Sequence, residues 1–278
     1  MPEGDTLHRT AAGLRPYLLG RTVTAARTAG PGALPQVGRI VGTEITAVEA
    51  LGKNLLIRFD NGLEIRTHLR MTGSWHHYRP GEAWRRPPAR ARLVIEVPGA
   101  VAVCFDAPVV ELLEQRVEGL HPPLGKLGPD LLAPELDADE ALRRLRDPAR
   151  AATAIGEALV DQRALAGAGN VYKSEVLWIE RIAPTTPIGE LDDVTLSRLV
   201  ATARRLLLAN ADRTRGPERV TTDRAGIGPL FVYGRAGRPC RRCGTPIASM
   251  RQGRDLPRTT YWCPSCQATA AVASPEHV

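Results

Sequence analysis

Four cysteines in the last third of the chain place the strongest constraint on its fold. They stand as CRRC (Cys240 and Cys243) and CPSC (Cys263 and Cys266), with residues 244–262 between the two pairs. Two C-x2-C pairs can present four thiolates tetrahedrally to Zn²⁺. Because a cytoplasmic compartment is reducing, we expect one structural zinc ion rather than two disulfides. Four thiolates fill the coordination shell, so this zinc would not be catalytic.

The charge of the chain narrows the class of partner. Its 278 residues carry 37 Lys and Arg against 30 Asp and Glu, a net charge of 37 − 30 = +7. Such a balance favours a polyanionic partner, nucleic acid before an anionic membrane, although a solvated basic surface is the alternative. No apolar run approaches the length of a membrane span, and the N-terminal residues lack a signal-peptide pattern. We therefore expect a cytoplasmic protein, monomeric and without membrane contact.

The first part of the chain predicts a helix followed by antiparallel strands. Apolar residues recur at helical spacing over 5–19, with Asp5 as a plausible N-cap and Pro16 expected to kink or end the helix. The strand patterns between 21 and about 113 are TEITAVEAL, NLLIRF, LEIRTHL, RLVIEV and AVAVCF. Asp60-Asn61-Gly62 and Pro98-Gly99 separate neighbouring strands as hairpin turns. These patterns favour a sandwich or barrel, and residues 76–91, which include the pair His76-His77, read as a polar loop.

The second part changes to helical periodicity. Residues 119–136 are rich in glycine and proline and read as a linker. Four helical patterns follow: DADEALRRLRD, IGEALVDQRAL, NVYKSEVLWIERI and DDVTLSRLVATARRLLLANA, the last capped by Asp192 or Asp193. The expected domains are a β-sandwich domain (1–118), the linker, a helical domain with a following bridge (137–230), a zinc finger (231–270) and a disordered tail (271–278).

Several single residues have both a chemical and a neutral interpretation. After removal of Met1, Pro2 would carry a secondary amine that can form an iminium with a carbonyl carbon, with the acid Glu3 beside it; proline is also a common second residue. Lys53 stands just before a strand, as a functional lysine or a surface one. Gly167 and Gly169 precede a helix start at Asn170, which suits a phosphate seat but also simple packing.

Together these motifs resemble a known family. MPEG at the N-terminus, GK before a strand, HLRMTGSW, GNVYKSE between helices and the CPSCQ knuckle occur in order over nearly the whole chain. This combination is similar to the formamidopyrimidine-DNA glycosylase/endonuclease VIII family of base-excision repair, and most like the second actinobacterial endonuclease VIII type. The resemblance implies a multidomain α+β fold: an N-terminal β-sandwich with a helix, a central helix–two-turn–helix domain and a C-terminal β-hairpin zinc finger.

The resemblance also implies the catalytic residues. Pro2 matches the N-terminal nucleophile that attacks C1′ of the damaged nucleoside and forms a Schiff base with the opened sugar. Glu3 matches the acid that handles the proton during ring opening. Lys53 matches a lysine that contacts phosphate and assists elimination. Arg258 matches the finger arginine that grips the phosphates around the flipped nucleotide and acts in δ-elimination.

The DNA contacts follow from the same match. Asn170 corresponds to the turn asparagine that binds the DNA backbone, and Lys126 to a basic contact of the linker. Met71 occupies the position of the wedge that fills the space left by a flipped base, and Arg70 that of a polar gap-filler.

The implied function is a bifunctional DNA glycosylase/AP lyase that acts on damaged DNA by β,δ-elimination. The chain departs from formamidopyrimidine-DNA glycosylases at DAPVVELLEQ, which lacks the Arg-Phe pair of a second wedge loop. The segment before FVYGRAG is also short for a loop that caps an oxidised purine. Both departures favour oxidised pyrimidines. The alternatives are an AP lyase with little glycosylase activity, and a non-catalytic damaged-DNA-binding or regulatory protein.

Overall fold

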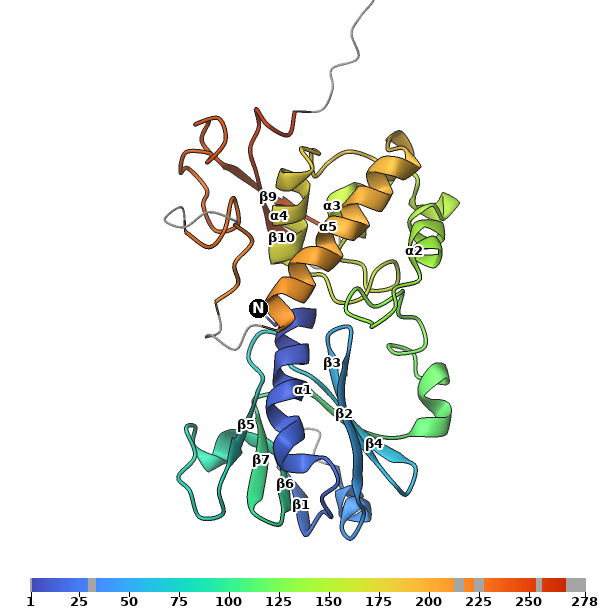
Figure 1. The fold of residues 1–278 in the computed structure, drawn as a ribbon, viewed down its shortest axis with the longest axis vertical. Helices are drawn as coiled ribbons and strands as arrows, with labels where there is room; N and C mark the ends of the chain where they lie inside the picture. Colours follow the sequence, from blue (N-terminus) through green and yellow to red (C-terminus); the bar gives the residue numbers. More distant parts are fainter. Residues whose placement is uncertain (1, 30–33, 213–217, 223–227, 254–256, 269–278) are drawn as a thin grey trace, which may run out of the picture. The chain divides into compact units, whose positions relative to one another are not determined.

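The computed structural model describes residues 2–29, 34–212, 218–222, 228–253 and 257–268. The chain divides into two compact units, Met1–Leu127 and Gly128–Val278 (Figure 1). The division falls inside the segment expected to be a linker. The tail expected at 271–278 and part of the bridge expected before the zinc finger lie outside the described residues.

Unit 1 is a sandwich of two antiparallel four-stranded sheets. One sheet has the order β1-β6-β7-β5 and the other β2-β3-β4-β8. The strands are β1 (Ala25–Thr28), β2 (Ile45–Leu51), β3 (Asn54–Phe59), β4 (Leu63–His68), β5 (Ser74–Tyr78), β6 (Ala91–Val97), β7 (Ala100–Phe105) and β8 (Val109–Glu114). Both predicted hairpin turns are confirmed, and Gly62 and Gly99 supply the positive φ angles that they need (79° and 82°).

Helix α1 (Gly4–Leu18) lies against this sandwich (Figure 1). Its buried side chains Leu7, Leu14 and Leu18 join the inner faces of the two sheets in one hydrophobic core. The expected N-cap is wrong: Asp5 lies within the first helical turn, and Glu3 takes the N-cap position with an extended backbone. Pro16 does not end the helix at its own position, because the last turn continues to Leu18.

The expected loop 76–91 is partly wrong. Strand β5 runs through His76 and His77 to Tyr78, and the 3-10 helix η2 (Pro88–Arg90) leads directly into β6. The two adjacent histidines obscured a strand in which Trp75 and Tyr78, on opposite faces, are both buried. Trp84, from the remaining loop, packs on a small apolar cluster that includes Tyr78 and Phe105. Unit 1 also contains the 3-10 helices η1 (Val37–Ile40) and η3 (Gln115–Leu120).

Unit 2 begins with helices around a core of its own. These are α2 (Ala138–Leu145), α3 (Ile155–Ala158), α4 (Asn170–Ile179) and α5 (Asp193–Ala211), with the 3-10 helices η4 (Pro148–Arg150) and η5 (Ile188–Glu190). The predicted cap of the last helix is confirmed, because the Asp192 carboxylate accepts the Thr195 N–H at 2.7 Å. Leu131 and Leu132, from the expected linker, belong to this core.

The helix expected over 155–165 is much shorter than the pattern predicts. Beyond Ala158, side chains bind backbone groups that a helix would need. Gln162 donates its amide to the carbonyls of Val160 and Ala168, both at 3.0 Å, and accepts the N–H of Gly167 at 3.0 Å. This competition between side chain and backbone ends α3 early.

The segment that carries the four cysteines, from residue 231 to 268 and here called the cysteine module, contains a two-stranded antiparallel sheet. Strands β9 (Ala248–Gln252) and β10 (Arg258–Trp262) pair with Arg258 opposite Gln252. A small cluster of Trp178, Val232, Cys240, Ile247 and Cys263 forms its core. Trp178 lies on α4, so this helix contributes to the helical core and to the cysteine module.

Candidate functional site

The N-terminal end of α1 lies at the end of the sandwich that carries the β2–β3 turn. The Arg15 guanidinium donates to the carbonyl of Val48 at 2.8 Å, and the Gly20 N–H donates to that of Ile45 at 2.9 Å. Helix α1 therefore runs antiparallel to β2, and its first residues lie toward the end of β2 (Figure 1). Pro2 is half-buried there, and Glu3 is completely buried.

Lys53 occupies the β2–β3 turn. Gly52 provides the left-handed residue of the turn (φ 57°), and the Asn54 side chain closes it by donating to the Leu51 carbonyl at 3.0 Å. Lys53 is 7% exposed, so the interpretation as an ordinary surface lysine is wrong. Lys53 is therefore a buried cation at this turn, and its charge acts on the neighbouring His68.

His68 is a neighbour of Lys53 that the sequence analysis did not single out. It ends β4 opposite Asn54, and its Nδ1 accepts the backbone N–H of Arg70 at 3.2 Å. Burial, followed by the charges of Arg66, Lys53 and Arg70, lowers the pKa of His68 to about 4. The ring is therefore neutral at pH 7, with its proton on Nε2 as a hydrogen-bond donor. Its position after a strand pattern, in HLRMTG, gave no separate signal.

The turn after His68 carries Arg70 and Met71. Both side chains are exposed, and Met71 is the more unusual, because 64% of this large apolar residue is in solvent. Arg70 takes a left-handed backbone conformation (φ 46°) that is uncommon outside glycine. Lys126, the third candidate contact of unit 1, is exposed near the end of that unit.

In unit 2 the structure brings Asn170 and Arg258 together. Asn170 is the first residue of α4, is 3% exposed, and donates its amide to the backbone carbonyl of Thr259 at 2.7 Å. Arg258 precedes Thr259 in β10. Within the described residues, Asn170 Oδ1 and Arg258 Nη1 are buried atoms without a hydrogen-bond partner. Each of the two side chains therefore retains hydrogen-bonding capacity, Asn170 on α4 and Arg258 on the strand that α4 contacts.

Helix α4 binds the segments around it through two side chains of one turn, Lys173 and Glu175. Lys173 donates to the Thr260 hydroxyl at 2.6 Å. The buried carboxylate of Glu175 accepts the N–H groups of Phe231, Val232 and Tyr233 at 2.8, 2.9 and 2.8 Å. Sequence reasoning missed Glu175, because its partners lie more than forty residues away along the chain.

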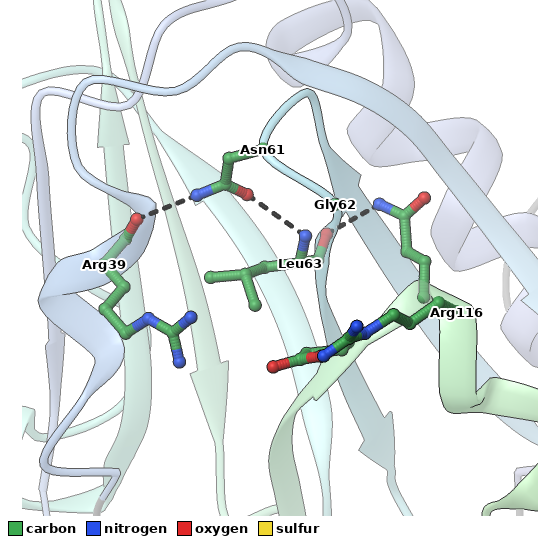
Figure 2. Close-up of a pocket in the computed structure, with 7 residues that line it drawn as sticks. Arg39, Asn61, Gly62, Leu63 and Arg116 are labelled. Carbon is green, nitrogen blue, oxygen red and sulfur yellow. Dashed lines mark hydrogen bonds and ion pairs between the residues drawn. The ribbon is translucent and has the colours of Figure 1, made fainter.

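Figure 2 shows a hollow at the opposite end of β3 from the Lys53 turn. It has a volume of ≈ 500 Å³. Asn61 organises its rim by donating to the Arg39 carbonyl at 3.0 Å and accepting the Leu63 N–H at 3.1 Å. Its charged side chains, Arg39, Glu114 and Arg116, include an ion pair between Arg116 and Glu114 at 2.7 Å. This lining has no nucleophile, so we do not place the reaction there.

Comparisons with known proteins decide the family. Residues 1–108 match the formamidopyrimidine-DNA glycosylase N-terminal domain, 127–218 its H2TH domain, and 237–269 the zinc finger found in FPG and IleRS. "Probable endonuclease 8 2" of Streptomyces coelicolor is 44% identical over 98% of this chain and 95% of its own length. The chain belongs to the formamidopyrimidine-DNA glycosylase/endonuclease VIII family.

Other members of the family match over almost their whole length. "DNA-(apurinic or apyrimidinic site) lyase Nei2" of Mycolicibacterium smegmatis is 39% identical, over 97% of this chain and all of the relative. A solved complex of Lactococcus lactis Fpg with DNA containing an abasic site has a TM-score of 0.78 at 22% identity, covering 97% of this chain and 99% of that one. The predicted fold of sandwich, helix–two-turn–helix domain and zinc-finger hairpin is confirmed.

The cysteines of this family member fit one structural zinc ion. The four Sγ atoms of Cys240, Cys243, Cys263 and Cys266 all lie within 4.8 Å of one another. Two of the separations are 3.9 Å (Cys240–Cys266) and 3.4 Å (Cys243–Cys263), close to the roughly 3.8 Å expected around tetrahedral zinc with bonds of about 2.3 Å. The indole N–H of Trp178 faces Cys240 Sγ at 3.4 Å, a donor suited to a thiolate.

The described helices include none that is long and apolar enough to cross a membrane.

Proposed function

We propose that this endonuclease VIII relative excises oxidised pyrimidines from DNA and then cleaves the strand at the abasic site. As a member of its family that matches its relatives over almost their whole length, it is a base-excision-repair DNA glycosylase with AP-lyase activity. The single observation that carries the finer proposal is the pairing of a half-buried Pro2 with a fully buried Glu3 at the start of α1. The damaged DNA on which several relatives were solved is the partner that we assign to this chain.

The proposed reaction begins once Met1 is removed and Pro2 has a free secondary amine. The neutral amine attacks C1′, the C1′–N bond to the base breaks, and the base leaves with a proton. Glu3 delivers a proton to the ring oxygen O4′ as the sugar opens, which leaves an iminium between Pro2 and C1′. An ordinary α-amino group has a pKa of about 7.7–8.0, so a usable neutral fraction exists near pH 7.

The iminium makes the following eliminations possible, because it acidifies the protons on C2′. Loss of a C2′ proton expels the 3′ phosphate (β-elimination), and a second elimination expels the 5′ phosphate (δ-elimination). We assign Lys53 to the phosphate at this end of the sandwich, since it is a buried cation at the β2–β3 turn. We add neutral His68 as a neighbouring donor through Nε2.

In unit 2 we assign Asn170 and Arg258 to the DNA backbone. The buried Nη1 of Arg258, unpartnered within the described residues, is suited to a phosphate oxygen, and Asn170 stands at the start of a helix, where the dipole favours an anion. Exposed Lys126 contributes a further phosphate contact. Arg70 and Met71 fill the gap left by the flipped nucleotide. Nucleotide flipping costs a few kcal/mol, which such a wedge offsets.

The preference for pyrimidines rests on β8 and the connection that leads into it from β7. The chain passes from Asp106 through Ala107 and Pro108 directly into β8, and these residues include no Arg-Phe pair. The other segment on which this preference rests, before FVYGRAG, includes residues 223–227, outside the described residues. An enzyme restricted to abasic sites is the second candidate, favoured by the relative named as an AP lyase.

Borohydride trapping tests the proposal. Duplexes carry 5-hydroxyuracil, 8-oxoguanine or an abasic site, and intact mass first establishes that Met1 is absent. We expect a covalent complex with 5-hydroxyuracil and with the abasic site, and its loss in Pro2→Gly. Trapping with the abasic site alone would favour the restricted AP lyase. Absence of trapping on every duplex, with DNA binding retained, would leave the non-catalytic damage-binding protein.

A further inference from the structure

Met71 is held exposed by a turn whose shape is strongly constrained. Its neighbour Arg70 has a φ of 46°, and a non-glycine residue in this left-handed region is strained. The Gly73 N–H donates to the Leu69 carbonyl at 2.9 Å and closes the turn. A Cβ at Gly73 would stand 2.8 Å from the backbone of Leu69 and 3.0 Å from Ala107, so only glycine fits.

The other side of this turn is fastened to Asp106, the residue after β7. The Thr72 hydroxyl donates to the Asp106 carbonyl at 3.0 Å. The Arg86 guanidinium donates both to the Thr72 carbonyl, at 3.3 Å, and to the Asp106 carboxylate. Thr72, which follows Met71 directly, is therefore held at its hydroxyl and at its carbonyl by two neighbouring residues.

Asp106 is itself fixed in an unusual conformation. Its φ is 52°, its N–H donates to the Arg90 carbonyl at 3.0 Å, and its carboxylate accepts the Arg90 Nε at 2.8 Å. The hydrogen bond from Arg90, together with that from Arg86, lowers the pKa of Asp106, so the carboxylate is ionised at neutral pH. Two left-handed residues, Arg70 and Asp106, thus lie on either side of the Thr72 hydrogen bond.

Strain of this kind, maintained around an exposed methionine that adds nothing to the core, indicates a functional requirement for the shape of the turn. We propose that Asp106 and Arg86 are positioning residues that hold the Met71 turn in the conformation needed to displace a stacked base. The proposal rests on the wedge role assigned to Met71 above. It assigns the ion pairs of the loop before β6 to base eversion rather than to fold stability alone.

The test separates eversion from the chemical steps. Single-turnover excision of 5-hydroxyuracil is measured in a duplex and in a single strand, and eversion is followed with 2-aminopurine next to the lesion. Asp106→Asn keeps a residue that tolerates the left-handed conformation but removes the charge, and Thr72→Val removes only the hydroxyl. Met71→Ala is the benchmark. Glu96→Gln, which breaks the ion pair of Glu96 with Arg27 in the same sheet, is the control.

We expect Asp106→Asn and Thr72→Val to slow duplex excision about two- to tenfold, the effect of one lost hydrogen bond. Their 2-aminopurine signal should rise more slowly, while the single-strand rate and abasic-site trapping stay within about twofold of the wild type. Glu96→Gln should match the wild type throughout. If Asp106→Asn and Thr72→Val excise the lesion from the duplex at the normal rate while Met71→Ala is slow, the positioning role of Asp106 and Arg86 is overturned and the wedge role of Met71 stands.

The remaining outcomes are also decisive. Equal losses on duplex and single strand would indicate a structural role and overturn the proposal. A normal duplex excision rate in Met71→Ala would overturn both the wedge role of Met71 and the positioning role of Asp106 and Arg86. Absence of covalent trapping in the wild type would instead overturn the proposed catalysis. The 2-aminopurine signal on a bound duplex would still report whether Asp106 and Arg86 assist eversion of the base. If Asp106→Asn does not fold, Thr72→Val decides.

Discussion

At the scale of single residues, the sequence predicts which side chains are candidates for the reaction better than it predicts how deeply each of them is buried. Pro2, Glu3 and Lys53 were selected by their sequence contexts, but neither the complete burial of Glu3 nor the 7% exposure of Lys53 could be read from them. Burial depends on which strands pack above a side chain, and that is a property of the tertiary fold. His68 and Asp106 were missed for the same reason, since their partners are assembled from separate turns.

His68 gives a prediction about pH. Its pKa in the folded protein is about 4, below the ordinary 6.5. As pH falls from 6.5 toward 4, His68 therefore binds a proton in the unfolded chain but stays neutral in the folded protein. This group therefore lowers the free energy of unfolding across that window, and its penalty is absent above pH 6.5. His68→Gln, neutral throughout, should flatten the decline.

Urea unfolding measures this effect as the difference between the free energy of unfolding at pH 7 and that at pH 5. The wild type should lose more stability than His68→Gln between these values. Identical losses would mean that His68 is as easily protonated in the folded protein as in the unfolded chain.

At the scale of elements, helix α4 links the helical core to the cysteine module, and Glu175 is its main side-chain anchor. Glu175→Ala would leave the N–H groups of Phe231, Val232 and Tyr233 without their acceptor. Each buried unsatisfied donor costs about 1–3 kcal/mol. We expect these amides to exchange with solvent at least a hundredfold faster, measured by hydrogen exchange. The exposed Glu190→Gln is the matched control and should leave them protected.

Local turn chemistry decided which elements were predictable. The Asp60-Asn61-Gly62 and Pro98-Gly99 turns specify their hairpins within a few residues, and β3 and β7 have the predicted limits. Strand β5 was missed because two adjacent histidines, one on each face of the strand, break its apolar pattern. Helix α3 was overestimated because its pattern continues past Ala158, where Gln162 binds the backbone instead.

At the scale of the whole molecule, zinc removal should affect the two units differently. The cysteine module has a small apolar core, so its order depends on the metal, whereas unit 1 has a large core of its own. A strong chelator should release one zinc per chain, detected with a metal-sensitive dye. Amides of β9 and β10 should then lose hydrogen-exchange protection while those of β3 and β7 keep it.

Thiol labelling provides a check on this prediction. After zinc removal the four module cysteines should react, while Cys104, buried in β7, stays unreactive, since burial raises the pKa of its thiol. Labelling of Cys104 at the same rate would show that unit 1 unfolds with the module, contrary to the expectation.

The strand order of the second sheet limits how the catalytic unit can be divided. Strand β8 is last in the sequence of the sandwich yet pairs with β4 from His68 to Leu63, beside the turns that carry the candidate residues. A fragment ended at residue 108, where the N-terminal family match stops, would leave β4 as a bare edge with unpaired backbone groups, open to association with another chain. A usable recombinant unit must therefore extend through Glu114.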